Sequence, residues 1–385
     1  MTEATAKQLV VAKQNTRSAK ARKKGKIDFS ILVITSILVL LGVVMVYSAS
    51  YYTADVKLDN PNYYFYKQMI GAVLGFGAML FLANFNYKNL EKLQVPILAV
   101  TLILLALVFS PIGISANGSR RWINLGFTTL QPAEVCKFAM IIFMSSFFSR
   151  KRKVLGSFKE GLLPVFIVLG IYCGLIMLQP NFSMVLCIGF VTVVMMFAGG
   201  VKMRHLIILG AIGIAAASFA VIQEPYRLKR LGAFMDPWAD SGASGYQLVQ
   251  SFYAIAGGGL FGKGLGMSQQ KLLFLPYGES DFIFSIIAEE LGFIGVIAIL
   301  SLYVVILWRG IRIALTCPDR FGSLLATGIT AVIAIQTLIN VGVVTGSIPP
   351  TGQPLPFISA GTSSLLIFMA SIGVLLNISK YCTKS

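Results

Sequence analysis

The sequence predicts an all-α integral membrane protein with ten transmembrane helices, both termini in the cytoplasm and one large extracytoplasmic loop. Hydrophobic residues make up 56% of the 385 residues and charged residues only 12%, and the mean hydropathy is +0.79. Apolar runs of about 20 residues, long enough to cross a hydrocarbon core of about 30 Å, recur along the whole chain. Lys and Arg concentrate in alternate connecting segments, and this asymmetry sets the orientation.

Residues 1–28 are polar and basic. This composition predicts a disordered cytoplasmic tail that is attracted to the inner leaflet, and docking of a cytoplasmic partner is an alternative role. No small-residue cleavage site follows a short apolar core, so we expect the first span to remain as an anchor. Residues 29–385 then form one polytopic membrane domain.

Ten apolar spans follow the tail. They are expected at 29–50, 66–86, 95–114, 131–149, 162–179, 182–200, 204–223, 283–308, 321–345 and 361–379. With the N-terminus inside, 22 Lys and Arg fall in inner segments and 9 in outer ones, which places both ends inside. The inner membrane surface therefore accounts for the net charge of +17, and we expect no nucleic-acid partner. The large outer loop is about 224–282.

Two acids, Glu279 and Asp281, stand where this outer loop enters the eighth span. Carboxylates at the mouth of a membrane span are costly to keep and indicate function. The dipole at a helix N-terminus favours the charged carboxylate, whereas an apolar wall raises its pKa, and a general base needs that balance. Asp281 is therefore either the working group of a membrane enzyme or an ordinary N-cap.

Further charged residues lie inside the predicted spans. Glu289 and Glu290 point to different faces of the eighth span, so we expect them to meet polar partners within the bundle. Glu134 and Lys137 are spaced i, i+3 in the fourth span, which lets them form an ion pair.

Arg120 and Arg121 beside Trp122 form a compact cationic patch in an outer segment. Guanidinium groups suit phosphate oxygens, although an anchor at the membrane interface is equally consistent with these residues. Residues 227–238 place basic and apolar residues at helical spacing, which predicts an amphipathic helix on the outer interface.

Lys263 lies in the Gly-rich run 257–264. We expect a flexible loop there, and because the run lacks the spacing of a nucleotide-binding P-loop, we expect no nucleotide site. The five cysteines are scattered without C-x-x-C spacing, and neither a disulfide nor a zinc site is expected.

Taken together, these segments resemble the SEDS family, the shape, elongation, division and sporulation proteins that include FtsW, RodA and SpoVE. The resemblance covers about residues 29–380. Its motifs, in order, are Gly118-Ser119-Arg120-Arg121-Trp122-Ile123, Gln131-Pro132-Ala133-Glu134 with Lys137, Glu279-Ser280-Asp281-Phe282-Ile283-Phe284 with Glu289-Glu290-Leu291-Gly292, Pro350-Thr351-Gly352, and Pro354-Leu355-Pro356-Phe357-Ile358-Ser359. The Arg120-Arg121 pair is closest to the FtsW/SpoVE branch.

The resemblance implies an inverting peptidoglycan glycosyltransferase that polymerises lipid II at the outer face of the cytoplasmic membrane. It assigns the catalytic role to Asp281. The candidates for binding substrate and pyrophosphate are Arg120, Arg121, Trp122, Lys263, Thr351 and Ser359, and the candidates for supporting roles are Glu134, Lys137, Glu279, Glu289 and Glu290. A divalent cation, Mg²⁺ or Mn²⁺, is a candidate cofactor, and no organic cofactor is expected.

The implied partners are lipid II, a class B penicillin-binding protein with transpeptidase activity, other divisome membrane proteins and membrane lipids. The implied location is the bacterial cytoplasmic membrane at the septum, with a role in division or sporulation.

Two segments depart from the family pattern. Asn181 stands where the family usually has Asp in Q-P-D-L-G-T, and Ala360 stands where it has Tyr in Y-G-G-[ST]-S. A lipid II flippase and a non-catalytic divisome scaffold are the alternative functions. A flippase needs a polar path across the membrane, whereas the polar residues here gather on one side, and this asymmetry favours an enzyme.

Overall fold

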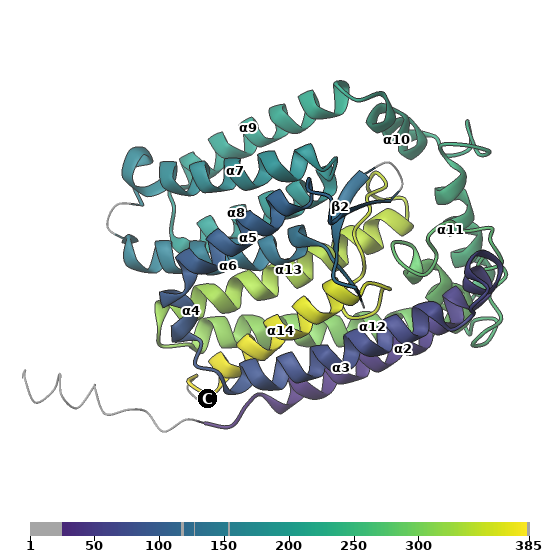
Figure 1. Cartoon of the computed structure of the whole chain (residues 1–385), viewed down its shortest axis with the longest axis horizontal. Coiled ribbons are helices and arrows are strands. Elements are labelled where there is room, and N and C mark those ends of the chain that lie inside the picture. Colours follow the sequence, from purple (N-terminus) through teal and green to yellow (C-terminus); the bar gives the residue numbers. More distant parts are fainter. Residues whose placement is uncertain (1–24, 117–118, 127, 153–154, 383–385) are drawn as a thin grey trace, which may run out of the picture.

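The computed structural model describes residues 25–116, 119–126, 128–152 and 155–382. Long helices run alongside one another as a bundle (Figure 1). They are α2 (Phe29–Leu58), α3 (Tyr63–Asn84), α4 (Lys88–Lys92), α5 (Gln94–Leu107), α6 (Pro132–Arg150), η2 (Phe158–Leu162), α7 (Leu163–Leu178), α8 (Phe182–Gly199), α9 (Met203–Ile222), α10 (Pro225–Met235), α11 (Tyr246–Gly258), α12 (Ile283–Thr316), α13 (Arg320–Val344) and α14 (Thr362–Ser379). Most of the predicted tail, residues 1–24, and Gly118 of the outer motif lie outside the described residues.

Nine helices among the described residues are long and apolar enough to cross a membrane, with η2 and α7 together forming one of them. The remaining predicted span, 95–114, corresponds to α5. Its 14 residues cover about 21 Å, which is less than the hydrocarbon core of about 30 Å. The helix stops early because Pro111 disfavours helical geometry at Ser110. The count of ten therefore remains a prediction.

The prediction of an all-α fold is wrong between α5 and α6, where a three-stranded antiparallel sheet forms. Its strands are β1 (Gly113–Ala116), β2 (Ser119–Asn124) and β3 (Thr129–Leu130), in the order β1-β2-β3. The segment 113–124 is short and mostly polar or Gly, so it does not continue as an apolar helix, and β-branched and aromatic side chains such as Ile114 and Trp122 favour strands. The sheet holds the arginine motif on β2.

Helix α13 lies in the middle of the bundle and contacts α6, α8 and α12, while α14 packs along α3. The last pair approaches closely because Gly373 has no side chain. A Cβ atom there would lie 2.4 Å from the carbonyl oxygen of Met79, so a larger residue would separate the two helices. Helix α9 lies at the edge, contacts mainly α8 and α10, and leaves most of its apolar surface exposed (Figure 1).

The first and last described residues lie at the same end of the bundle, which we call the terminal end. The backbone N–H of Gly25 donates to the carbonyl oxygen of Lys380 (2.8 Å), and the N–H of Asp28 donates to Ser379 Oγ (3.0 Å). Helices α10 and α11 and the sheet lie toward the opposite end, which we call the pocket end (Figure 1).

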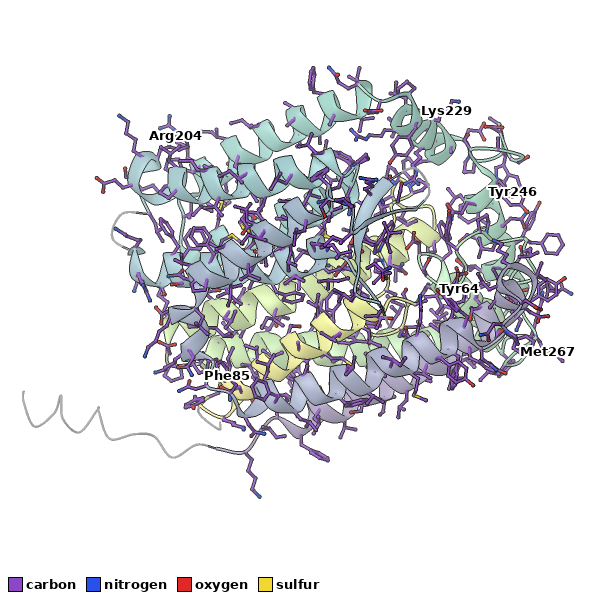
Figure 2. All side chains as sticks on the ribbon, in the orientation of Figure 1. Tyr64, Phe85, Arg204, Lys229, Tyr246 and Met267 are labelled. Atoms are coloured by element: carbon purple, nitrogen blue, oxygen red, sulfur yellow. The ribbon has the colours of Figure 1, made fainter. Side chains whose placement is uncertain are left out.

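Side chains mark the same two ends in Figure 2. Phe85 and Arg204 lie at the terminal end, and Lys229, Tyr246 and Met267 lie at the pocket end. The first and last described residues therefore lie at one end of the bundle, and the side of the membrane that this end faces remains a prediction.

The large loop 224–282 carries two helices, α10 and α11. Helix α10 confirms the helix predicted within 227–238, and its polar and apolar residues lie on opposite faces. Helix α11 buries Leu248 and Val249 and packs against α12. The loop is therefore a folded cover on the pocket end.

Candidate active site

Asp281 lies in a turn just before α12. The helix begins at Ile283 with Phe282 at the N-cap position, and no side chain caps it. The backbone N–H groups of Ser280 and Phe282 both donate to the carbonyl oxygen of Tyr277, which closes the turn (3.1 and 3.2 Å). The alternative that Asp281 is an ordinary N-cap is therefore wrong, because the helix starts too late to use its carboxylate.

Asn340 of α13 holds this turn in place through its side-chain amide. The Asn340 side-chain amide donates to the carbonyl oxygen of Asp281 (2.8 Å) and to that of Gln353 (2.9 Å). One buried amide therefore joins the turn to the loop that precedes α14.

That loop makes two further bonds to the turn. Ser359 Oγ donates to the carbonyl oxygen of Ser280 (2.6 Å), and the backbone N–H of Ala360 donates to the carbonyl oxygen of Glu279 (2.9 Å). Ser359 Oγ also accepts from the N–H of Leu355 (2.8 Å). Ser359, predicted to bind substrate, thus holds the Asp281 turn and is not part of the pocket lining.

A cavity of about 630 Å³ opens beside Asp281 at the pocket end. It is lined by residues from many segments of the chain, with both polar and apolar side chains. These are Ser119, Arg121, Trp122, Thr129, Gln131, Met177, Pro180, Asn181, Phe182, Ser183, Glu224, Tyr226, Arg227, Arg230, Gln247, Tyr277, Ser280, Asp281, Phe282, Pro350, Thr351, Gly352, Pro354, Ala360, Gly361, Thr362, Ser363 and Ser364. The cavity is therefore large enough for a substrate headgroup.

Gly352 lies directly against the Asp281 carboxylate. A Cβ atom at this position would lie 3.3 Å from Asp281 Oδ2. The absence of a side chain at Gly352 keeps this side of the carboxylate accessible.

The surroundings of Asp281 raise its pKa to about 6, mainly because burial disfavours the charged form. The nearby carboxylate of Glu279 acts in the same direction, while the guanidinium groups of Arg230 and Arg121 oppose the rise. The Glu279 carboxyl is itself held above its usual pKa, chiefly by burial. Asp281 is therefore ionised at neutral pH but has enough proton affinity to act as a base.

Arg121 and Arg120 occupy neighbouring positions on β2 but have different surroundings. Arg121 lines the cavity, and its guanidinium donates to the carbonyl oxygens of Gln179 (3.1 Å for Nε) and Pro180. Arg120 is exposed and does not line the cavity, whereas Trp122 does. Arg121, not the pair, therefore belongs to the pocket. The strand is irregular here, because Trp122 pairs with Ile114 and Arg120 with Ser115, which leaves Arg121 as the extra residue of a bulge.

Arg230 is a pocket residue that the sequence analysis did not select. It lies on α10, which folds back over the pocket end, and its Nη1 donates to the carbonyl oxygen of Pro350 (3.3 Å). Arg227 lies one turn earlier and stacks over the Phe182 ring at 5.1 Å. The signal in the sequence is the basic cluster on an amphipathic helix, a pattern that by itself predicts a helix at the membrane interface.

Lys263 is held away from the cavity. Its Nζ forms an ion pair with Glu289 Oε1 (2.7 Å), and it is not part of the lining. The role in pyrophosphate binding predicted for it is not supported by this position, because its charge is neutralised by a buried carboxylate.

Glu289 and Glu290 both have buried polar partners, as predicted. Glu289 also accepts from Ser268 Oγ, and Glu290 pairs with Lys271 (2.9 Å) and accepts from Ser48 Oγ of α2 (2.7 Å). These acids thus attach the segment after α11 to the bundle.

The predicted ion pair between Glu134 and Lys137 is present. Lys137 Nζ lies 2.9 Å from Glu134 Oε2, and both side chains are buried. The ammonium group also donates to Gln336 Oε1 of α13, and Ser364 Oγ of α14 donates to Glu134 (3.4 Å). Three helices, α6, α13 and α14, therefore meet at this pair, and Ser364 connects it to the cavity lining.

Asn181 and Thr351 both line the cavity. Asn181 caps α8 by accepting from the N–H of Met184 (3.4 Å), a role that Asn and Asp fill equally well. The Thr351 hydroxyl is buried and has no hydrogen-bond partner among the described residues, so it is available to a bound molecule.

The described residues contain no group of three or more His, Cys, Asp or Glu side chains placed to hold a metal ion. A Mg²⁺ or Mn²⁺ ion at Asp281 would therefore take most of its oxygen ligands from phosphate and water. The divalent cation stays a prediction.

A family model described as "Cell cycle protein", FTSW_RODA_SPOVE, matches residues 29–384. The chain belongs to the FtsW/RodA/SpoVE family. Within it, the chain is 44% identical to Stage V sporulation protein E of Bacillus subtilis (strain 168), over 93% of this chain and 98% of that protein. It is 38% identical to "Probable peptidoglycan glycosyltransferase FtsW" of Geobacter sp. (strain M18), over 91% of this chain and 96% of that protein.

The solved structures that share the FtsW/RodA/SpoVE fold include these two. One is a chain of "Structural coordination of polymerization and crosslinking by a peptidoglycan synthase complex", with a TM-score of 0.75 and 28% identity, over 92% of this chain and 97% of that chain. The other is the Rod shape determining protein RodA of Thermus thermophilus, with a TM-score of 0.66 and 27% identity, over 93% of this chain and 98% of that chain. The protein is thus a multi-pass membrane member of this family.

Proposed function

We propose that the protein is a peptidoglycan glycosyltransferase that polymerises lipid II into glycan strands. The observation that carries the proposal is the cavity of about 630 Å³ that is lined by the Asp281 carboxylate together with the cationic side chains of Arg121 and Arg230. A base beside cations suits the attack of a sugar hydroxyl on a pyrophosphate-linked sugar. FtsW relatives named peptidoglycan glycosyltransferases support the same reaction.

In the proposed reaction, Asp281 accepts the proton of the acceptor sugar 4-hydroxyl while its oxygen attacks the anomeric carbon of the donor. A C–O bond forms there, and the bond from the anomeric carbon to the pyrophosphate oxygen breaks. The undecaprenyl pyrophosphate leaves with the electron pair, and its growing negative charge is stabilised by Arg121 and Arg230. Attack from the face opposite the leaving group inverts the anomeric configuration.

The membrane arrangement that fits this reaction has ten crossings, with the short helix α5 counted as the third. The pocket end then faces the outside and both termini lie in the cytoplasm, in agreement with the excess of Lys and Arg in the predicted inner segments. The donor lipid can remain in the outer leaflet while its headgroup occupies the cavity.

The proposed partner is a class B penicillin-binding protein, which would crosslink the strands as they are made. The similarity to a chain of a peptidoglycan synthase complex supports this pairing. Other divisome membrane proteins and a septal location are proposed from the family resemblance to FtsW and SpoVE.

The test is polymerisation of labelled lipid II by the purified protein, alone and with its co-purified transpeptidase. Wild type should give glycan ladders, Asp281→Asn should give none, and the matched control Asp240→Asn, which changes an exposed acid of the same outer loop, should behave as wild type. Equal ladders from both variants would remove Asp281 from the mechanism. Absence of ladders from wild type with its partner bound would favour a flippase or a scaffold.

A further inference from the structure

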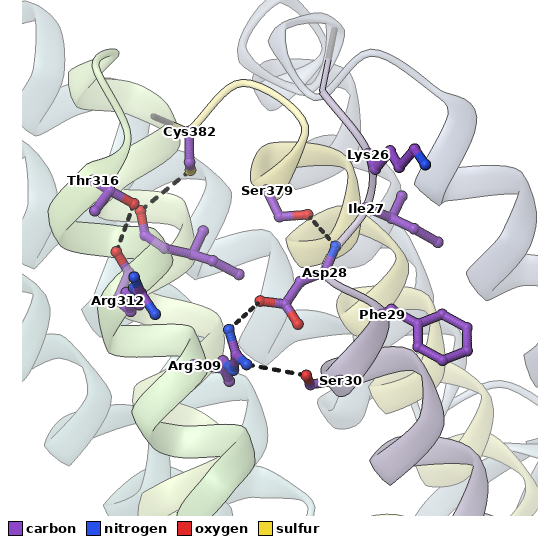
Figure 3. A pocket seen from close by; sticks show the side chains of 11 residues that line it. Lys26, Ile27, Asp28, Phe29, Ser30, Arg309, Arg312, Thr316, Ser379 and Cys382 are labelled. Atoms are coloured by element: carbon purple, nitrogen blue, oxygen red, sulfur yellow. Dashed lines mark hydrogen bonds and ion pairs between the residues drawn. The ribbon is translucent and has the colours of Figure 1, made fainter. Parts of the chain in front are cut away.

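A second cavity, of about 290 Å³, lies at the terminal end of the bundle. Three segments form it: the residues that lead into α2, the C-terminal part of α12 and the end of α14 (Figure 3). The lining residues that the argument uses are Lys26, Asp28, Ser30, Arg309, Arg312 and Ser379. The cavity is far larger than the share of about 30 Å³ that one water molecule occupies, so it has room for a polyatomic ion or headgroup.

The lining carries more positive than negative charge. Lys26, Arg309 and Arg312 are its basic residues, and Asp28 is the carboxylate among the lining residues. An anion entering the cavity would therefore meet a net attraction.

Arg309 retains hydrogen-bonding capacity in this cavity. One guanidinium N–H reaches Asp28 Oδ2 at 3.5 Å, which is long for a charge-assisted bond, and another donates to Ser30 Oγ (3.1 Å) (Figure 3). The buried Nε has no partner among the described residues. A phosphate oxygen would be a better acceptor than the distant carboxylate because it can take two guanidinium donors at once.

The position of the cavity along α12 matches the headgroup layer. Helix α12 is kinked at Gly292, where the backbone is not helical. The part after this kink, 293–316, is about 36 Å long, whereas the hydrocarbon core is about 30 Å thick. Its last turns, which hold Arg309 and Arg312, therefore reach the edge of the hydrocarbon region. Trp308 lies beneath both guanidinium groups (5.2 and 6.0 Å) and is 56% exposed, as expected for an aromatic residue at the membrane interface.

Large apolar side chains on the segments that form the cavity are exposed. Phe29 is 69% exposed and Leu315 is 81% exposed. Acyl chains attached to a headgroup in the cavity would lie against such surfaces, which a free phosphate ion would leave uncovered.

We propose that this cavity binds the phosphate headgroup of an anionic phospholipid, in the leaflet that surrounds the terminal end. Arg309 and Arg312 contact the phosphate oxygens, and Lys26 adds positive charge at the rim. Binding would join the chain before α2 to the ends of α12 and α14 and so stabilise the terminal end. This site is separate from the Asp281 cavity and does not depend on the proposed glycosyltransferase activity.

The test measures phosphatidylglycerol bound to the full-length purified protein, by native mass spectrometry and by the rise in Tm on adding the lipid in detergent. Arg309→Gln combined with Arg312→Gln should weaken binding at least about tenfold, since each charge-assisted bond contributes more than a neutral one. Arg204→Gln removes an exposed cation at the same end, outside the cavity, and should bind as wild type. Equal loss, or no loss, in both variants would overturn the proposal.

A second variant is expected to bind the lipid more tightly, a result that misfolding could not produce. Asp28→Asn removes the carboxylate that competes with phosphate but keeps an oxygen that can cap α2, so we expect tighter binding by a few fold. Weaker or unchanged binding would contradict the proposal.

Phosphatidylcholine and inorganic phosphate should raise Tm much less than phosphatidylglycerol does. A rise of equal size with inorganic phosphate would assign the cavity to a soluble anion, and one of equal size with phosphatidylcholine would rule out selection for anionic lipid.

Discussion

The side-chain amide of Asn340 donates to the backbone carbonyl of Asp281 (2.8 Å) and, through the same nitrogen, to that of Gln353 (2.9 Å). The residue on which the proposed chemistry depends is thus held in place by a helix 59 positions away in sequence. Because the amide is buried, water cannot replace these bonds, and the carboxylate position depends on them.

We expect Asn340→Asp to lower kcat about ten- to hundredfold while KM changes little, because an ionised Asp cannot donate and the displaced Asp281 turn loses its reactive geometry. Rates of lipid II polymerisation at varied substrate concentration measure both constants. Asn377→Asp is the matched control, since Asn377 is also a buried amide that donates to a backbone carbonyl (2.8 Å), but on α14 near α3. A similar loss of kcat in both variants would mean that the effect is general destabilisation.

The pKa of about 6 for Asp281 predicts the pH dependence of the reaction. A base works in its deprotonated form, so kcat/KM should fall tenfold per pH unit below about 6 and level off above it. Arg230 lowers this pKa, so Arg230→Gln should move the midpoint to higher pH. A profile without a break between pH 5 and 7 would exclude Asp281 as the titrating group.

The same pKa predicts that Asp281→Asn, the substitution expected to abolish activity, increases the stability of the folded protein. The pKa of Asp281 in the folded protein lies above the ordinary value of 3.8 for an aspartate, so folding favours the protonated acid, and the ionised acid destabilises the protein at pH values above the folded pKa. Asp281→Asn should therefore be more stable than wild type at pH 7, by up to about 3 kcal/mol. The difference should shrink as the pH falls through 6 toward 4. Thermal unfolding in detergent across this pH range would show it, and a lower Tm for the variant at pH 7 would contradict it.

Gly352→Ala should lower kcat and leave the protein folded. The new methyl group would lie 3.3 Å from Asp281 Oδ2 and narrow the approach of the acceptor hydroxyl, so we expect kcat to drop about tenfold. Gly242→Ala is the control, because a Cβ at that exposed loop position has no heavy atom within 4 Å. Full activity of Gly352→Ala would show that this face of the carboxylate is not used.

Substitution of the two arginines of β2 should have very different effects on kcat/KM. Arg121→Gln removes a guanidinium that lines the cavity, and kcat/KM should fall at least about tenfold. Arg120→Gln changes an exposed side chain outside the lining and should stay within about threefold of wild type. If the Arg120 variant is impaired and the Arg121 variant is not, the strand assignment of the pocket is wrong.

The membrane spans could be predicted because apolar length alone identifies them, and nine of the ten predicted spans have a counterpart among the long helices of the described chain. The short sheet was missed because a strand of four to six residues leaves little signal in a hydropathy pattern. Asp281, Arg121 and the Glu134–Lys137 pair were found from residue type and spacing. Arg230 and Asn340 could not be selected as site residues in this way. Both reach the site only because the fold brings α10 and α13 to the Asp281 turn, and no local sequence pattern shows that arrangement.

The close packing of α14 on α3 has a consequence for biosynthesis. Helix α3 is among the first segments made, but its contact surface, including the backbone at Met79, is covered by Gly373 near the end of the chain. Although α3 also packs against α2, this face of α3 stays uncovered until α14 has been made, and the bundle closes only after α14 is inserted. A chain cut short before Thr362 would keep the Asp281 turn in its sequence but would lack the helix that completes the fold.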